Sequence, residues 1–228
     1  MAEKKNVTDL ENEEIIAKAQ DFWTRYQKQI TIVLAVLVLA VGGWYGYRNF
    51  IQKPKEQKSV DVMYKAEEYY RMDSLQKALN GDGINKGFLS VIKDYGGTDA
   101  GNLARYYAGD CYLRTGDYNN AVKYLKDFST SSKMVQARAY KLLADAYGEL
   151  GKNDEAISNY KKAANHFSED THNSAEYLYY GASLAEKAGK TNEAIELYKQ
   201  VIDKFPTSTS AQEAEKYLSK LGVYNYNK

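Results

Sequence analysis

The hydrophobic pattern of the chain begins with one long uncharged run. Residues 30–47 read ITIVLAVLVLAVGGWYGY and contain no Asp, Glu, Lys or Arg. At 1.5 Å per residue this run forms an α-helix of about 27 Å, close to the hydrocarbon thickness of a bilayer. Trp23 and Trp44 stand near its two ends, where interfacial aromatic residues are expected. The pattern predicts a single transmembrane helix over 30–47.

Two other interpretations of this run are weaker. A buried core helix of a soluble domain would carry a polar face, and this run has none. A cleaved signal peptide would begin with a short basic region, whereas the preceding residues 1–29 are long and acidic. We therefore expect an uncleaved anchor.

The segments that flank the run have patterns of their own. Within residues 1–29, apolar residues recur at spacings of three and four, which predicts an amphipathic helix. Residues 48–57 form a juxtamembrane linker that includes several basic residues. Gly42 and Gly46 have the spacing of a small-residue contact motif, so they are candidates for contact with another membrane helix.

Charge does not decide the orientation of the anchor. Lys18, Arg25 and Lys28 precede the run, and four basic residues follow it within a similar distance. The positive-inside rule compares these two sides, and the difference is too small to choose between them. From charge alone, both orientations remain open.

Beyond Pro54 the chain repeats itself at a spacing of 35 residues, and then of 38. Each copy places a small residue ahead of a glycine and another small residue behind it. The aligned positions are Gly109, Gly116 and Ala121 in the first copy, Ala144, Gly151 and Ala156 in the second, and Ala182, Gly189 and Ala194 in the third. This spacing predicts a helix, a left-handed glycine turn and an antiparallel second helix that approaches the first closely.

Weaker signals extend the array in both directions. Residues 91–96 match residues 201–206 at a distance of 110. This match indicates a degenerate first unit, with its first helix over 60–72 and an insertion at 80–83. Residues 210–221 carry one apolar stripe and predict a closing helix of the kind that repeat arrays need.

Together these patterns predict an all-α fold: a single N-terminal transmembrane helix followed by an α-solenoid of helix hairpins with a C-terminal capping helix. The predicted parts are an amphipathic segment over 1–29, a transmembrane helix over 30–47, a linker over 48–57, a helical repeat domain over 58–222 and a tail over 223–228.

Composition excludes several classes of function. Lys and Arg number 31 against 30 Asp and Glu, a formal net charge of +1, so no nucleic-acid partner is expected. The single cysteine, Cys111, allows neither an internal disulfide nor a cysteine metal cluster. The 22 tyrosines are too many for a disordered polar segment and indicate many half-buried positions.

The candidate chemical sites are weak. His166 and His172, with Glu169 and Asp170 between them, could be drawn as a metal site, but their spacing is not a strong metal signature. We interpret them as loop residues and Cys111 as a small buried filler. No nucleotide-binding loop is present. We therefore predict no enzyme activity, no metal and no cofactor.

The repeated residues resemble the tetratricopeptide repeat family. The strongest unit carries Tyr140, Leu143, Ala144 and Tyr147 in its first helix and Ala156, Tyr160 and Ala163 in its second. The third unit departs from the pattern, with Ala185 in place of an aromatic residue and Gly181 in place of leucine. The resemblance covers about residues 58–221 and implies a concave face, built from the first helices, that binds segments of other proteins.

By the family's pattern, one set of residues forms the candidate partner-binding face. They are Tyr106, Asp110, Arg114, Arg138, Lys141, Asp145, Glu149, Glu176, Tyr179, Ser183 and Lys187. Because acidic residues are mixed with basic ones, we do not expect this face to grip a terminal carboxylate. Tyr106 and Tyr179 are the strongest candidates, because an exposed tyrosine gives contact area at low entropic cost.

The layout of a short N-terminal segment, one span and about four repeats resembles the ancillary subunit of the bacterial Sec translocon. That resemblance implies a single-pass protein of the bacterial inner membrane, with its N-terminus in the cytoplasm and its repeats in the periplasm. The implied partners are translocon subunits, periplasmic chaperones or unfolded client proteins, with membrane lipid around the span. The functional prediction is a membrane-tethered, non-enzymatic scaffold, either an ancillary translocon subunit or a chaperone-associated adaptor.

Two alternatives remain open. One is a scaffold for envelope assembly or for another secretion machine, although its lipoprotein form is excluded because Cys111 does not follow a signal sequence. The other, less favoured, is a metal-binding or enzyme-accessory subunit, which would require the two histidines to form a genuine site.

Overall fold

The chain forms two compact units, Met1–Pro54 and Lys55–Lys228. The computed structural model describes residues 7–224, so residues 1–6 and 225–228 of the predicted terminal segments lie outside the described residues. All named secondary-structure elements of the described residues are helices, so the predicted all-α fold is confirmed.

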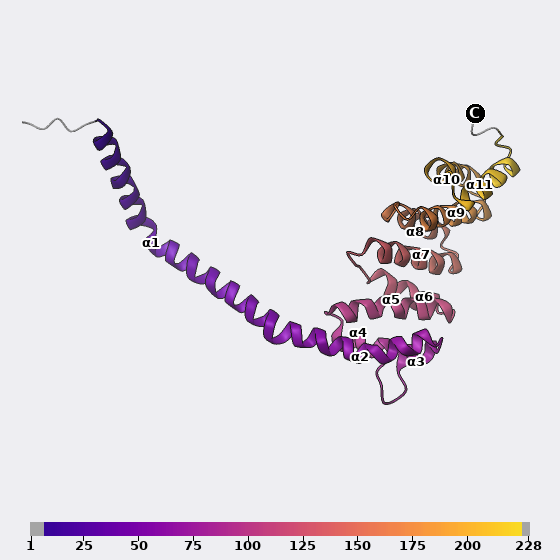
Figure 1. The fold of residues 1–228 in the computed structure, drawn as a ribbon, viewed down its shortest axis with the longest axis horizontal. Helices are drawn as coiled ribbons and strands as arrows, with labels where there is room; N and C mark the ends of the chain where they lie inside the picture. The colour runs from indigo at the N-terminus through magenta and orange to yellow at the C-terminus, as the bar shows by residue number, and fades with distance from the viewer. Residues whose placement is uncertain (1–6, 225–228) are drawn as a thin grey trace, which may run out of the picture. The chain divides into compact units, whose positions relative to one another are not determined.

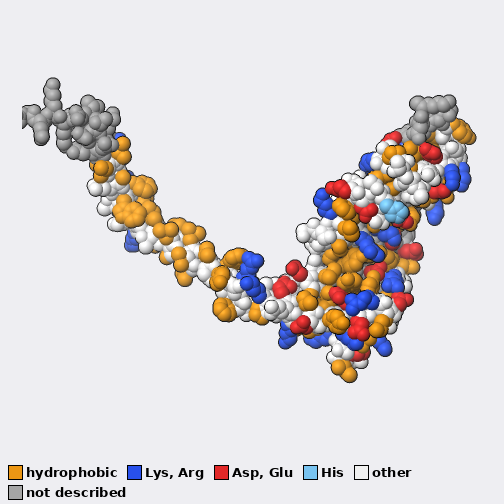
Figure 2. Space-filling model, in the orientation of Figure 1, with side chains coloured by type: hydrophobic (Ala, Val, Ile, Leu, Met, Phe, Trp, Pro, Cys, Tyr) orange, Lys and Arg blue, Asp and Glu red, His pale blue; other side chains and the backbone are white. Residues whose placement is uncertain are grey.

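The N-terminal unit contains one long helix, α1 (Val7–Tyr47), followed by the π-helix η1 (Arg48–Gln52). The apolar side chains of residues 30–47 are mostly exposed, and Figure 2 shows hydrophobic surface along this helix. Leu39 is 75% exposed. By its length and composition alone, this helix is able to cross a bilayer.

The predicted amphipathic segment and the predicted span are not separate helices. From Val7 onward both belong to α1. Residues 15–29 contain neither glycine nor proline, so nothing in the sequence interrupts the hydrogen-bond ladder. The aromatic side chains of this segment stay exposed, with the rings of Phe22 and Tyr26 4.9 Å apart.

The predicted juxtamembrane linker, residues 48–57, is helical throughout. It comprises η1 and the first turn of α2 (Lys53–Arg71). Pro54 has no N–H to donate, and the wider π-turn lies directly ahead of it, ending where the Lys53 N–H donates to the Arg48 carbonyl. A proline in the first turn leaves the rest of α2 intact.

The second unit is a stack of helix pairs, seen in Figure 1 from α2 to α11. Helices α5 and α6, α7 and α8, and α9 and α10 pack against each other as pairs, and α11 packs on α10. The bounds are α3 Leu75–Asn80, α4 Phe88–Tyr95, α5 Asp99–Arg114, α6 Tyr118–Lys126, α7 Lys133–Glu149, α8 Asn153–His166, α9 Thr171–Lys187, α10 Thr191–Lys204 and α11 Thr209–Lys220.

The predicted glycine turns are confirmed. Gly116, Gly151 and Gly189 have φ values of +82°, +70° and +74°, the left-handed region that glycine adopts without a steric cost. After α5, the Asp117 N–H donates to the Tyr112 carbonyl at 2.9 Å, which satisfies a carbonyl that the helix end leaves free. The same bonding recurs after α7 and α9.

Small residues bring the paired helices together, as predicted. A Cβ placed on Gly109 would lie 2.5 Å from Cγ of Leu125, so only glycine fits this crossing of α5 and α6. Ala121, Ala144 and Ala156 are fully buried between helices. The core is therefore a series of interfaces along the stack, as repeat architectures require.

The predicted degenerate first unit contains a larger insertion than the sequence indicated. The predicted helix over 60–72 is the later part of α2, and the extra material includes helix α3 as well as the following loop. In that loop Gly81 pairs with Lys86 in an isolated antiparallel bridge.

The match between residues 91–96 and 201–206 belongs to a local structure that the chain forms twice, 110 residues apart. The hydroxyl of Thr98 donates to the Tyr95 carbonyl, and the hydroxyl of Ser208 donates to the Phe205 carbonyl, at 2.7 and 2.8 Å. Both hydroxyl oxygens then accept an N–H from the first turn of the next helix. The second of these helices is α11, the predicted closing helix.

Candidate protein-binding groove

The first helices α7 and α9 border two clefts, which together we call the α7–α9 groove. The first cleft has a volume of about 500 Å³ and is lined by four predicted partner-binding residues: Asp145, Glu149, Ser183 and Lys187. Three tyrosines and two leucines that the sequence analysis did not place on the partner-binding face also line it. They are Tyr118, Tyr160, Tyr180, Leu113 and Leu184.

Tyrosine hydroxyls orient the carboxylates of this cleft. Tyr160 donates to Oδ1 of Asp145 at 2.6 Å, and Lys141 donates to Oδ2 of the same carboxylate at 2.8 Å. Burial, followed by the charge of Asp145, raises the pKa of Tyr160 far above its usual value. The phenol therefore remains a neutral donor, and the charge of Asp145 is offset by Lys141.

Glu149 is the more available carboxylate of the cleft. Its side chain is exposed, and its negative charge is the main cause that raises the pKa of the neighbouring Tyr118 hydroxyl. A neutral phenol does not compensate that charge. The cleft therefore presents an anionic group beside aromatic and aliphatic walls.

The second cleft, of about 340 Å³, continues the groove toward the start of α7. The predicted residues Arg138, Lys141 and Glu176 line it, together with apolar side chains that include Met134 and Phe167. Arg138 is exposed, so this cleft presents a cationic group at its rim.

A small cluster separates the two clefts. The ion pair of Lys141 with Asp145 lies beside Tyr180, whose ring centre is 5.8 Å from Nζ of Lys141. Tyr180 in turn donates to Glu176, and that hydrogen bond, with burial, raises the pKa of Tyr180 to about 12. Each cleft of the groove thus combines charged side chains of both signs with apolar walls.

Tyr106 does not lie in the groove, and its expected exposure is wrong. The side chain is only 8% exposed and packs against Tyr107 and Phe128, with ring centroids 5.5 and 5.4 Å away. Its position on α5 faces the interface with the next repeat. The hydrophobic pattern of α5 does not reveal this, because tyrosine is compatible with either environment.

Asp110 and Arg114 belong to an internal network. Asp110 is 8% exposed and accepts a hydrogen bond from the Tyr70 hydroxyl, and Arg114 pairs with both Asp110 and Asp73. These contacts join α5 to α2. Their structural role was not apparent from the sequence, because Tyr70 and Asp73 lie about forty residues earlier.

Tyr179 is half-buried in an aromatic cluster. Its ring lies 5.8 Å from that of Tyr198 and 6.0 Å from that of Tyr217, so it packs α9 against α10 and the closing helix. Neither cleft of the groove includes it.

The two candidate membrane-contact glycines lie on α1. A Cβ built on Gly42 or Gly46 meets no other atom within 4 Å, so this face of α1 is open. Their contact with another helix stays a prediction.

The histidine region has separate structural roles. Asp170 caps α9 by accepting the Asn173 N–H, and Glu169 pairs with Lys133. His166 stands edge-on to Tyr140. Among the described residues, no group of three or more His, Cys, Asp or Glu side chains is placed to hold a metal ion.

Comparison with family models identifies the helix pairs. Residues 135–206 match the model of the tetratricopeptide repeat. The pairs α7–α8 and α9–α10, which this match covers, are similar to tetratricopeptide repeats. Residues 98–163 also match the model of the anaphase-promoting complex, cyclosome, subunit 3.

A solved structure has a similar fold. The crystal structure of MamA protein superposes with a TM-score of 0.56 and covers 72% of this chain and 83% of its own, at 19% sequence identity. At that identity the likeness concerns the fold alone. No curated protein sequence matches this chain.

Proposed function

We propose that this protein is a membrane-tethered scaffold that holds a segment of a partner protein in the α7–α9 groove. Its tetratricopeptide fold supports a role in protein–protein interaction. The observation that carries the proposal is the groove itself, in which Glu149 and Arg138 present opposite charges beside apolar walls.

The exposed apolar surface of α1 supports the membrane tether. Burying such a surface in hydrocarbon is favourable, and the run over 30–47 is about as long as a bilayer core is thick. A tether raises the effective concentration of the groove near membrane-bound partners, so a modest affinity is sufficient.

We propose further that the protein serves as an ancillary subunit of the bacterial Sec translocon, with its repeats in the periplasm of an inner-membrane protein. The support for this assignment is the resemblance in layout: a short segment, one span and an array of repeats. Translocon subunits, periplasmic chaperones and unfolded clients are the proposed partners.

Site-specific photocrosslinking in intact membranes tests the groove. A photoreactive amino acid at Ser183 or Lys187 lies in the first cleft, and one at the exposed Lys126 of α6 is the matched control. We expect adducts with translocon or chaperone components from the first two positions only. Equal adducts from Lys126, or no adducts from the groove, would contradict the proposal.

The same experiment separates the proposal from its alternative. Adducts with outer-membrane assembly proteins would favour an envelope-assembly scaffold.

Protease added to spheroplasts tests the orientation, because periplasmic repeats are cleaved and cytoplasmic repeats are protected.

A further inference from the structure

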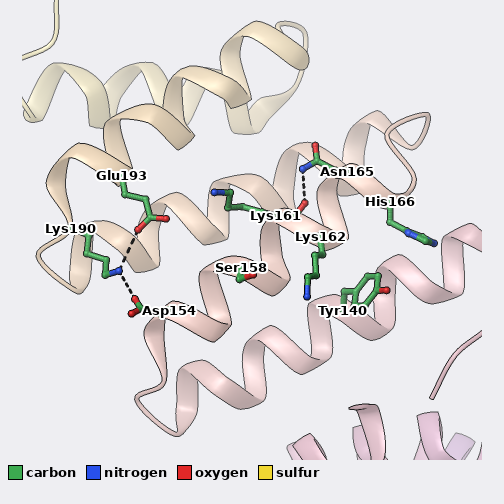
Figure 3. A pocket seen from close by; sticks show the side chains of 9 residues that line it. All are labelled: Tyr140, Asp154, Ser158, Lys161, Lys162, Asn165, His166, Lys190 and Glu193. Carbon is green, nitrogen blue, oxygen red and sulfur yellow. Dashed lines mark hydrogen bonds and ion pairs between the residues drawn. The ribbon is translucent and has the colours of Figure 1, made fainter. Parts of the chain in front are cut away.

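A third cleft lies on the opposite set of helices. It has a volume of about 710 Å³ and is formed by the second helices α8 and α10, with Tyr140 of α7 at one side (Figure 3). We call it the outer cleft. None of the residues that line it also lines the α7–α9 groove.

One lysine forms ion pairs with both acidic side chains of the outer cleft. Lys190, at the start of α10, pairs with Asp154 of α8 and with Glu193 of its own helix (Figure 3). Both carboxylates are therefore engaged within the fold, at the end of the cleft where α8 and α10 begin.

The remaining charges of the cleft are positive. Lys161 and Lys162 line it, and in the part of the chain that the structure describes neither forms an ion pair. Lys204, the last residue of α10, lies toward the end of the cleft where α8 and α10 finish, and its Nζ donates to Oδ1 of Asn165 at 3.1 Å. Away from Lys190, the cleft therefore carries the two cationic groups of Lys161 and Lys162, which no described carboxylate pairs with.

Side chains that can donate hydrogen bonds also line the cleft beside these lysines. The hydroxyl of Ser158 lies between the Lys190 bridge and Lys162, and the rings of Tyr140 and His166 stand edge-to-face at 5.5 Å (Figure 3). Hydroxyl and imidazole groups both donate hydrogen bonds to carboxylate oxygens.

We propose that the outer cleft binds an acidic segment of a second protein, with Lys161 and Lys162 pairing its carboxylates. The length of the cleft favours a segment over a small anion. Between Asp154 and His166, α8 rises about 18 Å at 1.5 Å per residue, which matches about five residues of extended chain. The scaffold then holds one partner in the α7–α9 groove and another in the outer cleft.

Fluorescence anisotropy with an acidic peptide tests this inference. The probe is a fluorescein-labelled peptide of alternating glutamate and serine, added to the full-length protein in a neutral detergent. We expect the double variant Lys161→Gln, Lys162→Gln to bind it about tenfold more weakly than the wild type, because two charge pairs are lost. Added salt weakens wild-type binding.

The matched control is the double variant Lys123→Gln, Lys126→Gln. It removes the same charge from α6, the second helix of the preceding repeat, and should bind the peptide as the wild type does. Glu149→Gln, which alters the α7–α9 groove, should also leave this affinity unchanged. Thermal melts monitored by circular dichroism confirm that each variant is folded.

Three results would overturn the inference. If the wild-type protein does not bind the acidic peptide, the proposed site does not exist. If the Lys123 and Lys126 variant loses as much affinity as the Lys161 and Lys162 variant, the peptide responds only to the net charge of the protein. If the Lys161 and Lys162 variant instead loses binding to phosphatidylglycerol vesicles while keeping the peptide, the surface binds lipid and not a protein segment.

Discussion

Tyrosine hydroxyls that donate to carboxylates recur through the repeat domain. Tyr160 donates to Asp145 within the groove, and Tyr198 donates to Glu186 between α10 and α9. Each bond fixes an acidic side chain and keeps the phenol neutral, because burial and the nearby negative charge both raise the tyrosine pKa. Much of the high tyrosine content is thus explained by packing between helices.

Tyr106 gives a prediction about alkaline stability. Burial raises its pKa to about 12, above the value of about 10 in an unfolded chain, so the folded state favours the neutral phenol. Its contribution to stability is present below about pH 10 and is lost as the pH rises toward 12. We expect Tyr106→Phe to lose less stability than the wild type between these pH values, as measured by urea midpoints.

The matched control for this prediction is Tyr64→Phe, on a side chain that is 61% exposed. It should show the same alkaline dependence as the wild type. Identical dependence in Tyr106→Phe would contradict the burial argument.

Cys111 gives a second prediction at this scale. The thiol is fully buried in α5, and burial raises its pKa to about 12. Since the thiolate is the reactive form, we expect iodoacetamide at about pH 8 to label the native protein at least about a hundredfold more slowly than the urea-unfolded protein.

An exposed cysteine provides the control for the labelling experiment. Ser129→Cys in a Cys111→Ala background places the thiol in the exposed loop after α6 and should react rapidly in both states. Native labelling of Cys111 at that rate would show that α5 opens readily.

At the scale of helices, two glycines inside first helices lead to opposite predictions. Gly109→Ala places a Cβ 2.5 Å from Leu125, so we expect a loss of about 1–3 kcal/mol in the free energy of unfolding from overpacking. Gly148→Ala meets its nearest neighbours at 3.9 and 4.0 Å, ordinary contact distances. There we expect a gain of about 0.5–1 kcal/mol from the better helix former.

Urea unfolding followed by circular dichroism measures both changes. Each glycine is the control for the other, because the substitution is the same and only the space around it differs. A similar loss of stability at both positions would mean that the space around each glycine does not determine the effect of the substitution.

The helical elements could largely be predicted from sequence, because glycine spacing and apolar periodicity are local signals. The turns at Gly116, Gly151 and Gly189 and the closing helix α11 are confirmed. Helix α3 and the π-helix η1 were not predicted. A six-residue helix is too short to show periodicity, and the π-turn depends on how the ladder adapts to Pro54.

At the scale of the whole array, stability should depend on the closing helix. Leu218 of α11 is 1% exposed and joins the core cluster that includes Leu197 and Tyr198 of α10. We expect Leu218→Ala to lower the free energy of unfolding by about 2–4 kcal/mol. Hydrogen exchange should show the loss of protection mainly in α9 and α10, because each repeat contacts only its neighbours.

The control for this prediction is Lys216→Ala, on the exposed side of the same helix. It should leave the exchange pattern unchanged. A uniform loss of protection from α5 to α11 in Leu218→Ala would show that the array unfolds as one cooperative block.

The candidate site was only partly predictable, because it depends on contacts between repeats. Spacing placed Asp145, Glu149, Ser183 and Lys187 on first helices, and the structure brings them into one cleft. The sequence could not show that Asp110 accepts a hydrogen bond from Tyr70, since that pairing depends on how α2 packs on α5. The tyrosine walls were missed because Tyr118 and Tyr160 come from second helices.

The continuity of α1 has a consequence for the N-terminal residues. If residues 30–47 cross a bilayer, as proposed, the same helix continues beyond the hydrocarbon through residues 7–29, over a helical length of about 35 Å at 1.5 Å per residue. Tyr26 and Trp23 then lie about one and two helical turns from the edge of the hydrocarbon, at the depth of the lipid headgroups, where exposed aromatic side chains are favoured.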